Sequence, residues 1–284
     1  MPARTHNPEQ PTPTATNLRR ELSARNLARA ADHTHETTYG SIASVLYRED
    51  DLSNHGNFFP ASYKRIQRNP QWFARLNKTY TASSRIARGH ERTRSELDCA
   101  NSSDALLMNI FCHPTALRSK PLQSLLSIES NAQPDFGVRV RTPLANDLED
   151  RTEIDMQLGD LLVEAKLSET GFQTARPALM ARYEAFEQVF DTERLPRTGN
   201  NHYRHYQLLR GALAAHHTNS RFALFTDNRR PDLHEAWFQT LSAIQTFDLR
   251  SRMLLLTWQE LATHLPKPLQ QFLTTKYGII PQNP

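Results

Sequence analysis

Two carboxylates and a lysine interrupt an otherwise apolar segment of the chain. The run TEIDMQLGDLLVEAKLSE, residues 152–169, contains Asp155, Glu164 and Lys166. Gly159-Asp160 separates two alternating runs and is typical of a two-residue hairpin turn, because Gly accepts the positive φ that such turns need. With that turn, Asp155 is expected directly opposite Glu164 on the neighbouring strand.

The expected hairpin sorts its side chains onto two faces, because successive side chains of a strand alternate. One face has no polar member: Ile154, Met156, Leu158, Leu161, Val163, Ala165 and Leu167. The other face collects the charged residues: Glu153, Asp155, Gln157, Leu162, Glu164 and Lys166. Directly opposed like charges destabilise a sheet. A cation bound by Asp155 and Glu164 would offset that repulsion.

These residue types suit phosphodiester hydrolysis. Oxygen-only ligands favour Mg²⁺, with Mn²⁺ as the expected substitute, held by Asp155 and Glu164. Lys166 would orient or help deprotonate a metal-bound water, or neutralise charge developing on a phosphate. The alternative is an amphipathic edge hairpin whose polar face is simply solvated, with Glu153 and Lys166 as a surface ion pair.

The order Asp155, eight residues, then Glu164-Ala165-Lys166 resembles the PD-(D/E)xK nuclease motif. In that superfamily an Asp on one strand joins an (Asp/Glu)-x-Lys tripeptide on the antiparallel next strand. Residues 101–111 (NSSDALLMNIF), 163–172 (VEAKLSETGF) and 206–210 (YQLLR) together resemble one branch, the uncharacterised restriction-endonuclease-like proteins of bacteria. The resemblance covers most of the chain. It implies an α/β restriction-endonuclease-like sandwich, a mixed central β-sheet flanked by helices, and metal-dependent cleavage of DNA.

The resemblance also implies further site residues. Gln207, on the helix after the motif strand, matches by order a glutamine that helps to hold the site in some exonuclease-like branches. The tyrosine that usually follows four residues later is Gly211 here, so only the glutamine carries over. A strand expected to end near Glu129 would supply a third metal carboxylate. A surface glutamate at a strand end is the alternative.

Two helices are expected to border the site. In the nuclease fold a helix before the first core strand packs beside it, and Ser102 offers N-cap chemistry for a helix to Cys112. Ser103 and Asn109 on that helix are therefore candidate phosphate contacts. Arg210 shares a helix face with Gln207, and its planar guanidinium suits a phosphate. A structural helix with surface polar side chains is the alternative.

A second aspartate competes with Asp155 for the first motif position. Pro134-Asp135 is a literal Pro-Asp ahead of Glu164, and the superfamily tolerates variable spacing. Its surroundings, NAQPDFG, are typical of a loop because of their Asn, Pro and Gly. Asp155 is preferred because the hairpin register alone brings it to Glu164. Glu153-Ile154 then replaces the motif's proline, a position that the family varies freely.

Basic charge is concentrated in the first third of the chain. The net charge is +4, yet the first 94 residues hold 15 Lys and Arg against eight Asp and Glu. Nine of these basic residues lie in 57–94, interleaved with aromatic side chains. Basic charge supplies phosphate affinity and aromatic rings stack on bases, so we expect Lys64 and Arg65 to contact nucleic acid. The expected nucleic acid is double-stranded DNA. A solvated basic face over a buried aromatic stripe is the alternative.

Composition and periodicity divide the chain into three expected parts. Residues 1–16, with four prolines, form a disordered tail, residues 17–100 a basic helical extension, and residues 101–284 the nuclease-like domain. Further elements are expected at 17–32 (helix), 60–100 (helices broken at Asn69-Pro70), 122–129 (helix, or strand by the resemblance), 176–191 and 203–217 (helices), 221–226 and 253–257 (strands), 257–260 (capping box) and 270–277 (helix).

Composition also excludes several classes. No apolar run approaches the roughly 20 residues of a membrane span, and two cysteines make neither a disulfide framework nor a zinc site. We therefore expect a cytoplasmic protein without a membrane partner. Cutting both strands would favour a homodimer.

Two other functions remain as alternatives to a nuclease. The leading rival is a nucleic-acid-binding protein that keeps the nuclease fold without catalysis. The other is a protein-interaction domain in which the motif is accidental.

Overall fold

A computed structural model describes residues 12–38, 42–78 and 95–282 of the chain. The chain forms two compact units. The first combines residues 1–15 with 135–256, and the second combines 16–134 with 257–284. The limits of these two units differ from those of the three parts expected from the sequence. The three expected parts stay predictions. No helix in the described segments is long and apolar enough to span a membrane.

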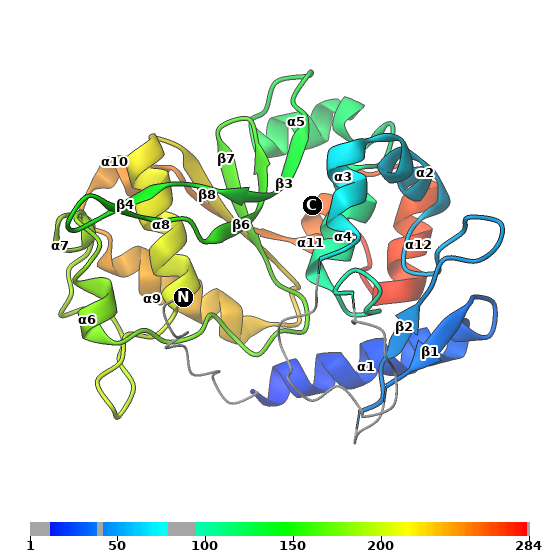
Figure 1. Cartoon of the computed structure of the whole chain (residues 1–284), viewed down its shortest axis with the longest axis horizontal. Coiled ribbons are helices and arrows are strands. Elements are labelled where there is room, and N and C mark those ends of the chain that lie inside the picture. Colours follow the sequence, from blue (N-terminus) through cyan, green and yellow to red (C-terminus); the bar gives the residue numbers. More distant parts are fainter. Residues whose placement is uncertain (1–11, 39–41, 79–94, 283–284) are drawn as a thin grey trace. The chain divides into compact units, whose positions relative to one another are not determined.

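The first unit is built on a five-stranded mixed sheet with the strand order β3-β6-β7-β8-β9 (Figure 1). Its strands are β3 (Pro134–Arg139), β6 (Glu153–Leu158), β7 (Leu161–Ala165), β8 (Arg221–Thr226) and β9 (Met253–Thr257). β6 and β7 are antiparallel, whereas β7 and β8 are parallel. The predicted α/β fold with a mixed central sheet is confirmed, and both strands predicted after the hairpin have the expected limits.

Helices α8 (Tyr206–Thr218) and α9 (Pro231–Ala243) pack on one face of this sheet. The apolar core that joins them to the sheet includes Leu162 and Phe222. Gly211 makes the close approach of α8 to β8 possible, because a Cβ atom there would lie 2.2 Å from Cζ of Phe222. Gly211 is therefore a packing residue.

The helix predicted for residues 176–191 is wrong. The segment forms two short helices, α6 (Pro177–Met180) and α7 (Phe186–Val189). Between them Tyr183 forms an isolated bridge with Leu144, and its hydroxyl donates to Asp150 at 2.6 Å. These partners belong to a small hairpin of β4 (Thr142–Leu144) and β5 (Leu148–Asp150). Pairing with this hairpin interrupts a helical pattern that is continuous in the sequence.

The loop expected for NAQPDFG is wrong from Pro134 onwards, because Asp135 lies in the edge strand β3, whereas residues 131–133 precede the strand. Pro134 is the first residue of that strand, a position where the missing N–H of proline is tolerated. The strand that the resemblance placed before Glu129 is a helix instead, α5 (Lys120–Leu126). The side chain of Ser119 caps α5 by accepting from the backbone N–H of Leu122.

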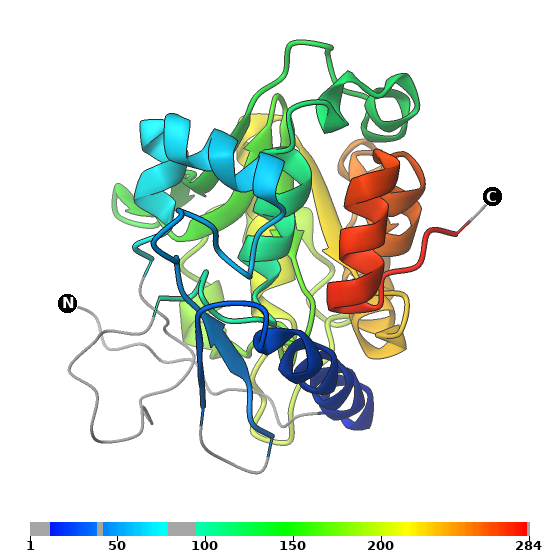
Figure 2. The same cartoon turned by 90° about the vertical axis from the view of Figure 1, so that its right-hand side faces the viewer.

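The second unit is mainly helical (Figures 1 and 2). Its elements are most of α1 (Pro13–Ala30), then β1 (His35–Thr37), β2 (Val45–Tyr47), α2 (Pro60–Arg68), α3 (Pro70–Arg75), α4 (Ser103–Phe111), the 3-10 helix η1 (Ala116–Arg118), α5, α11 (Trp258–Thr263) and α12 (Lys267–Tyr277). The break at Asn69-Pro70 and the capping box of Thr257 and Glu260 are confirmed. The short helix α10 (Phe247–Ser251) belongs to the first unit.

The expected disordered tail is in part helical. Residues 13–16 lie in the first turn of α1, whereas residues 1–11 fall outside the described segments. Proline suits the first helical position, since its missing N–H needs no partner there. The hydroxyl of Thr12 accepts from the backbone N–H of Ala15 at 3.2 Å and so caps this turn. A proline-rich composition therefore did not prevent helix formation from residue 13 onwards.

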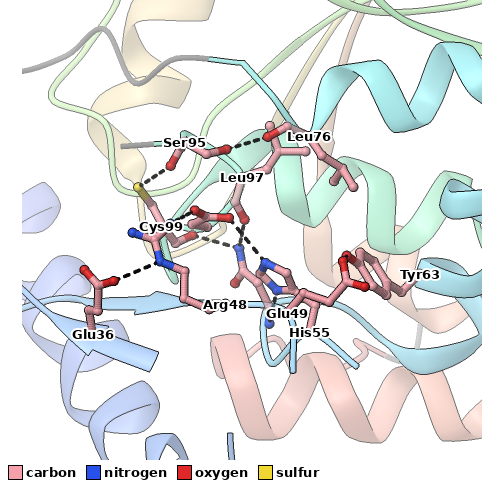
Figure 3. A network of polar contacts seen from close by, with 11 residues as sticks. Glu36, Arg48, Glu49, His55, Tyr63, Leu76, Ser95, Leu97 and Cys99 are labelled. Carbon is pink, nitrogen blue, oxygen red and sulfur yellow. Dashed lines mark hydrogen bonds and ion pairs between the residues drawn. The ribbon is translucent and has the colours of Figure 1, made fainter. Parts of the chain in front are cut away.

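A polar network connects distant parts of the second unit (Figure 3). Arg48 donates to Glu36 at 3.2 Å and pairs with Asp98. Asp98 also faces Nε2 of His55 at 3.3 Å. The network ties β1, β2 and the segment before α2 to the chain around residue 98. Its charged groups neutralise one another, which favours a structural role over a catalytic one.

Candidate active site

The hairpin has the predicted register. Leu158 pairs with Leu161 and Met156 with Val163, across a turn in which Gly159 has a φ of +62°. Along β6 the side chains alternate between buried and half-buried, as expected, with Asp155 among the half-buried ones. The register from which we expected Asp155 opposite Glu164 is thus confirmed from the turn as far as Met156.

Strand pairing stops one position before the two carboxylates. The last pair of the ladder is Met156–Val163, and beyond it the side chain of Asp155 takes over. Its Oδ2 accepts a hydrogen bond from the backbone N–H of Ala165 at 2.8 Å. The Asp155 carboxylate therefore lies at the point where β6 leaves β7, fixed against the backbone between Glu164 and Lys166.

Glu164 and Lys166 form a buried ion pair. Their residues are only 1% and 6% exposed, and Nζ of Lys166 donates to Oε1 of Glu164 at 2.7 Å. β7 is an inner strand with β6 and β8 on either side. The alternative of a solvated edge hairpin is therefore wrong. An inner strand that buries two charges is unusual, because such burial costs free energy even for a pair.

The charge state of Lys166 follows from its neighbours. Burial lowers the pKa of its amine, but the carboxylates of Glu164, Asp155 and Glu169 outweigh burial and raise the pKa above its ordinary value. Lys166 is therefore an ammonium at neutral pH. The ring of Phe172 lies 5.7 Å from Nζ and adds a favourable cation–π contact.

Sequence reasoning missed Arg230, which holds the chain immediately after the motif strand. This fully buried side chain donates from Nη1 to the carbonyl oxygens of Leu167 (3.1 Å) and Glu169 (2.8 Å). Its Nε and Nη2 donate to Asp232 at 2.9 and 2.8 Å. The signal was the charged run DNRRPD directly after the strand 221–226, since polar residues at the carboxyl end of an inner strand often serve a site.

Gln207 and Arg210 lie near the same end of the hairpin. Gln207 is half-buried in the first turn of α8, and its backbone N–H donates to the carbonyl of Phe172 at 3.0 Å. Arg210 is 6% exposed, and its Nη2 donates to the carbonyl oxygen of Glu153 at 3.0 Å. Arg210 thus holds the start of β6. A phosphate contact for Arg210 and a catalytic role for Gln207 stay predictions.

The other predicted site residues belong to the second unit. Glu129 is exposed in the segment after α5. Ser103 and Asn109 are buried on α4. The Asn109 amide donates to the carbonyls of Asn57 (3.0 Å) and Ala105 (2.8 Å), and its oxygen accepts from the N–H of Phe59. A phosphate contact of Asn109 would have to replace these bonds.

The basic segment divides into exposed and internally paired side chains. Lys64 is exposed on α2, whereas Arg65 is half-buried over the ring of Trp72, 5.2 Å away. Arg75 and Lys78 pair with the buried carboxylate of Asp104 at 2.9 and 2.6 Å. These two cations hold the pKa of Asp104 below its ordinary value against the effect of burial, which raises it. Part of the basic charge is therefore structural, and residues 79–94 lie outside the described segments.

Asp155 and Glu164 supply the type of ligand that magnesium takes. Mg²⁺ commonly takes one or two carboxylates and completes its octahedron with water and substrate phosphate oxygens. Within the described residues, no group of three or more His, Cys, Asp and Glu side chains is arranged to hold a metal. A metal held by Asp155 and Glu164, with or without Glu129, stays a prediction.

A family of known proteins matches almost the whole chain. The family is described as restriction endonuclease associating with ARP, and its match covers residues 24–278. The chain belongs to this family. No curated protein and no solved structure matches it significantly. Membership supports a nuclease-type activity with DNA as the substrate, and agrees with the mixed sheet that carries the motif hairpin.

Proposed function

We propose that this member of the restriction-endonuclease family hydrolyses DNA phosphodiester bonds in a Mg²⁺-dependent reaction of the PD-(D/E)xK type. One observation carries the proposal. Asp155 and the Glu164–Lys166 pair meet where β6 leaves β7, on an inner strand where burying charge costs free energy even for an ion pair. The alternative, a catalytically silent DNA-binding protein, does not need this set.

The residues have distinct roles in this proposal. Asp155 and Glu164 hold the cation, which when bound stabilises the negative charge that develops on the scissile phosphate. Lys166 stays protonated, since its pKa is raised. It therefore orients the attacking water and neutralises charge on the phosphate, and deprotonation of that water falls to another acceptor. Gln207 helps to hold the loop that carries Phe172.

A cation at Glu164 would share this carboxylate with the Lys166 ammonium. Oε1 of Glu164 accepts from Lys166 at 2.7 Å, so a cation bound at this oxygen would compete with the ammonium. Nζ of Lys166 would then need another acceptor.

The partners follow from the family and the composition. We propose double-stranded DNA as the substrate, bound in part by exposed basic side chains such as Lys64. The family description names association with ARP, and we propose ARP as a protein partner of this chain. A homodimer and a cytoplasmic location stay predictions.

Nicking of supercoiled plasmid with Mg²⁺ or Mn²⁺ tests the proposal. Asp155→Asn keeps an oxygen for the N–H of Ala165 and should abolish nicking without unfolding the hairpin. Asp160→Asn makes the same chemical change at the exposed turn and is the matched control, because a surface ion pair contributes little. Lys166→Ala should also lose activity, whereas Lys120→Ala on an exposed helix position should not.

Three results have clear meanings. Metal-dependent nicking lost in both site variants and kept in both controls supports the proposed site. Nicking that persists in Asp155→Asn and Lys166→Ala contradicts it. Salt-sensitive DNA binding by a wild-type protein that never nicks favours the catalytically silent alternative.

A further inference from the structure

A hydroxyl without a partner lies at the end of β8. Thr226 is the last residue of this strand, is fully buried, and its Oγ1 has no hydrogen-bond partner in the structure. Leaving a buried hydroxyl unpaired costs free energy, and most buried polar atoms in proteins are paired. Such an atom in a native fold calls for an explanation, and a valine of the same shape would avoid the cost.

The strand register places Thr226 beside Lys166. β7 and β8 are parallel, with Ala165 paired with Phe225, and the backbone N–H of Lys166 donates to the carbonyl of Phe225 at 2.8 Å. Lys166 follows the last pair of this ladder on the β7 side and Thr226 follows it on the β8 side, so continuing the register by one position brings the two residues opposite each other. Neighbouring side chains in register point to the same face of a sheet. The register therefore puts the unpaired hydroxyl on the face that carries Glu164 and Lys166.

We propose that Thr226 is a positioning residue for Lys166. In the structure the ammonium donates to Glu164. If a cation took the place of the ammonium at Glu164, the hydroxyl of Thr226 would accept a hydrogen bond from Nζ and hold the ammonium in position. This inference rests on the proposed function.

The proposal differs in its consequences from a purely structural role. If Thr226 only fills space, Thr226→Val is neutral or stabilising and changes neither cation affinity nor turnover, because it removes an unpaired hydroxyl and keeps the volume. If it positions Lys166, the same variant leaves the displaced ammonium without an acceptor. Binding of a cation and turnover then both suffer, while the metal-free protein keeps its stability.

Three measurements on the full chain test this. They are the melting temperature in EDTA, the dissociation constant of Ca²⁺ by calorimetry, and kcat and KM for plasmid nicking with Mg²⁺. For Thr226→Val we expect an unchanged or higher melting temperature, about tenfold weaker Ca²⁺ binding and about tenfold lower kcat, with KM unchanged. Thr226→Ser should restore both losses. The matched control is Thr240→Val, a fully buried threonine on α9 whose hydroxyl donates to Ala236; it should lower the melting temperature and leave kcat unchanged.

A double variant makes the test specific. In a Lys166→Met background no ammonium is displaced, so adding Thr226→Val should leave Ca²⁺ affinity unchanged. The inference is overturned if Thr226→Val keeps the wild-type kcat and Ca²⁺ affinity, or if its losses are equal with and without Lys166. In either case, nicking by the wild-type protein still supports the proposed function. If the wild type neither nicks nor binds Ca²⁺ through Asp155, the proposed function fails, and the role of Thr226 fails with it.

Discussion

Replacing Lys166 by methionine separates the energetic role of the buried ion pair from its catalytic role. Methionine has a comparable length but no charge, so Lys166→Met leaves the Glu164 carboxylate buried without its cation. The two side chains are 7% and 2% exposed and their charged atoms lie 2.7 Å apart. Removing one partner of such a pair typically destabilises a protein by about 3–5 kcal/mol, because the other charge stays desolvated.

The loss should depend on pH and on divalent cations. The stabilisation from Lys166 is fully present below its ordinary pKa of 10.5 and is lost only as the pH rises through its raised pKa, so an assay near neutral pH measures the whole contribution. Ca²⁺ should reduce the deficit, because it replaces the lost positive charge.

Urea unfolding in EDTA at several pH values, with and without Ca²⁺, measures these effects. The control is the double variant Glu164→Gln with Lys166→Met, which removes both charges and should recover most of the stability. Lys166→Met should also bind Ca²⁺ more tightly than the wild type, since no ion pair has to open, and yet fail to nick DNA. A single variant as stable as the wild type, or a double variant as unstable as the single one, would refute the reasoning.

Three further outcomes follow from particular contacts. Gly211→Ala should destabilise the protein by about 1–3 kcal/mol in urea unfolding, because the new methyl overlaps the ring of Phe222. Burial raises the pKa of Asp232, but the hydrogen bonds of Arg230 and nearby hydroxyls lower it to about 2. This carboxylate should contribute about 2 kcal/mol above its unfolded pKa near 4, lost as the pH falls towards 2, so unfolding of Asp232→Asn should approach the wild type in acid. Lys64→Ala should weaken DNA binding equally for all sequences and lower its salt dependence by about one unit, as filter binding at several salt concentrations would show.

Local chemistry determined much of the fold. The hairpin turn, its register and the segregation of apolar from charged side chains depend on Gly159 and on alternation over a few residues. The strands 221–226 and 253–257 and the capping box at Thr257 were predicted for the same reason, since their signals are contained in a few consecutive residues. The choice of Asp155 over Asp135 also rested on this register.

Long-range pairing decided what local patterns could not. Asp135 lies in a strand because β6 offers it a neighbour, although its own surroundings are typical of a loop. Tyr183 interrupts a continuous helical pattern because it pairs with residue 144, far away in the sequence. Neither partner is visible in the segment itself, since the free energy of such pairing comes from the other strand.

The sequence by itself determined which side chains could do chemistry and that Asp155, Glu164 and Lys166 share a face of one hairpin. Only the tertiary structure decided that Glu164 and Lys166 are buried as an ion pair at an inner strand, and that β8, which ends at Thr226, pairs with β7. The physical reason is that alternation along a strand is local, whereas burial depends on β8 and α8. Those elements come from parts of the chain at least forty residues away, and their packing turns a polar hairpin face into a low-dielectric site.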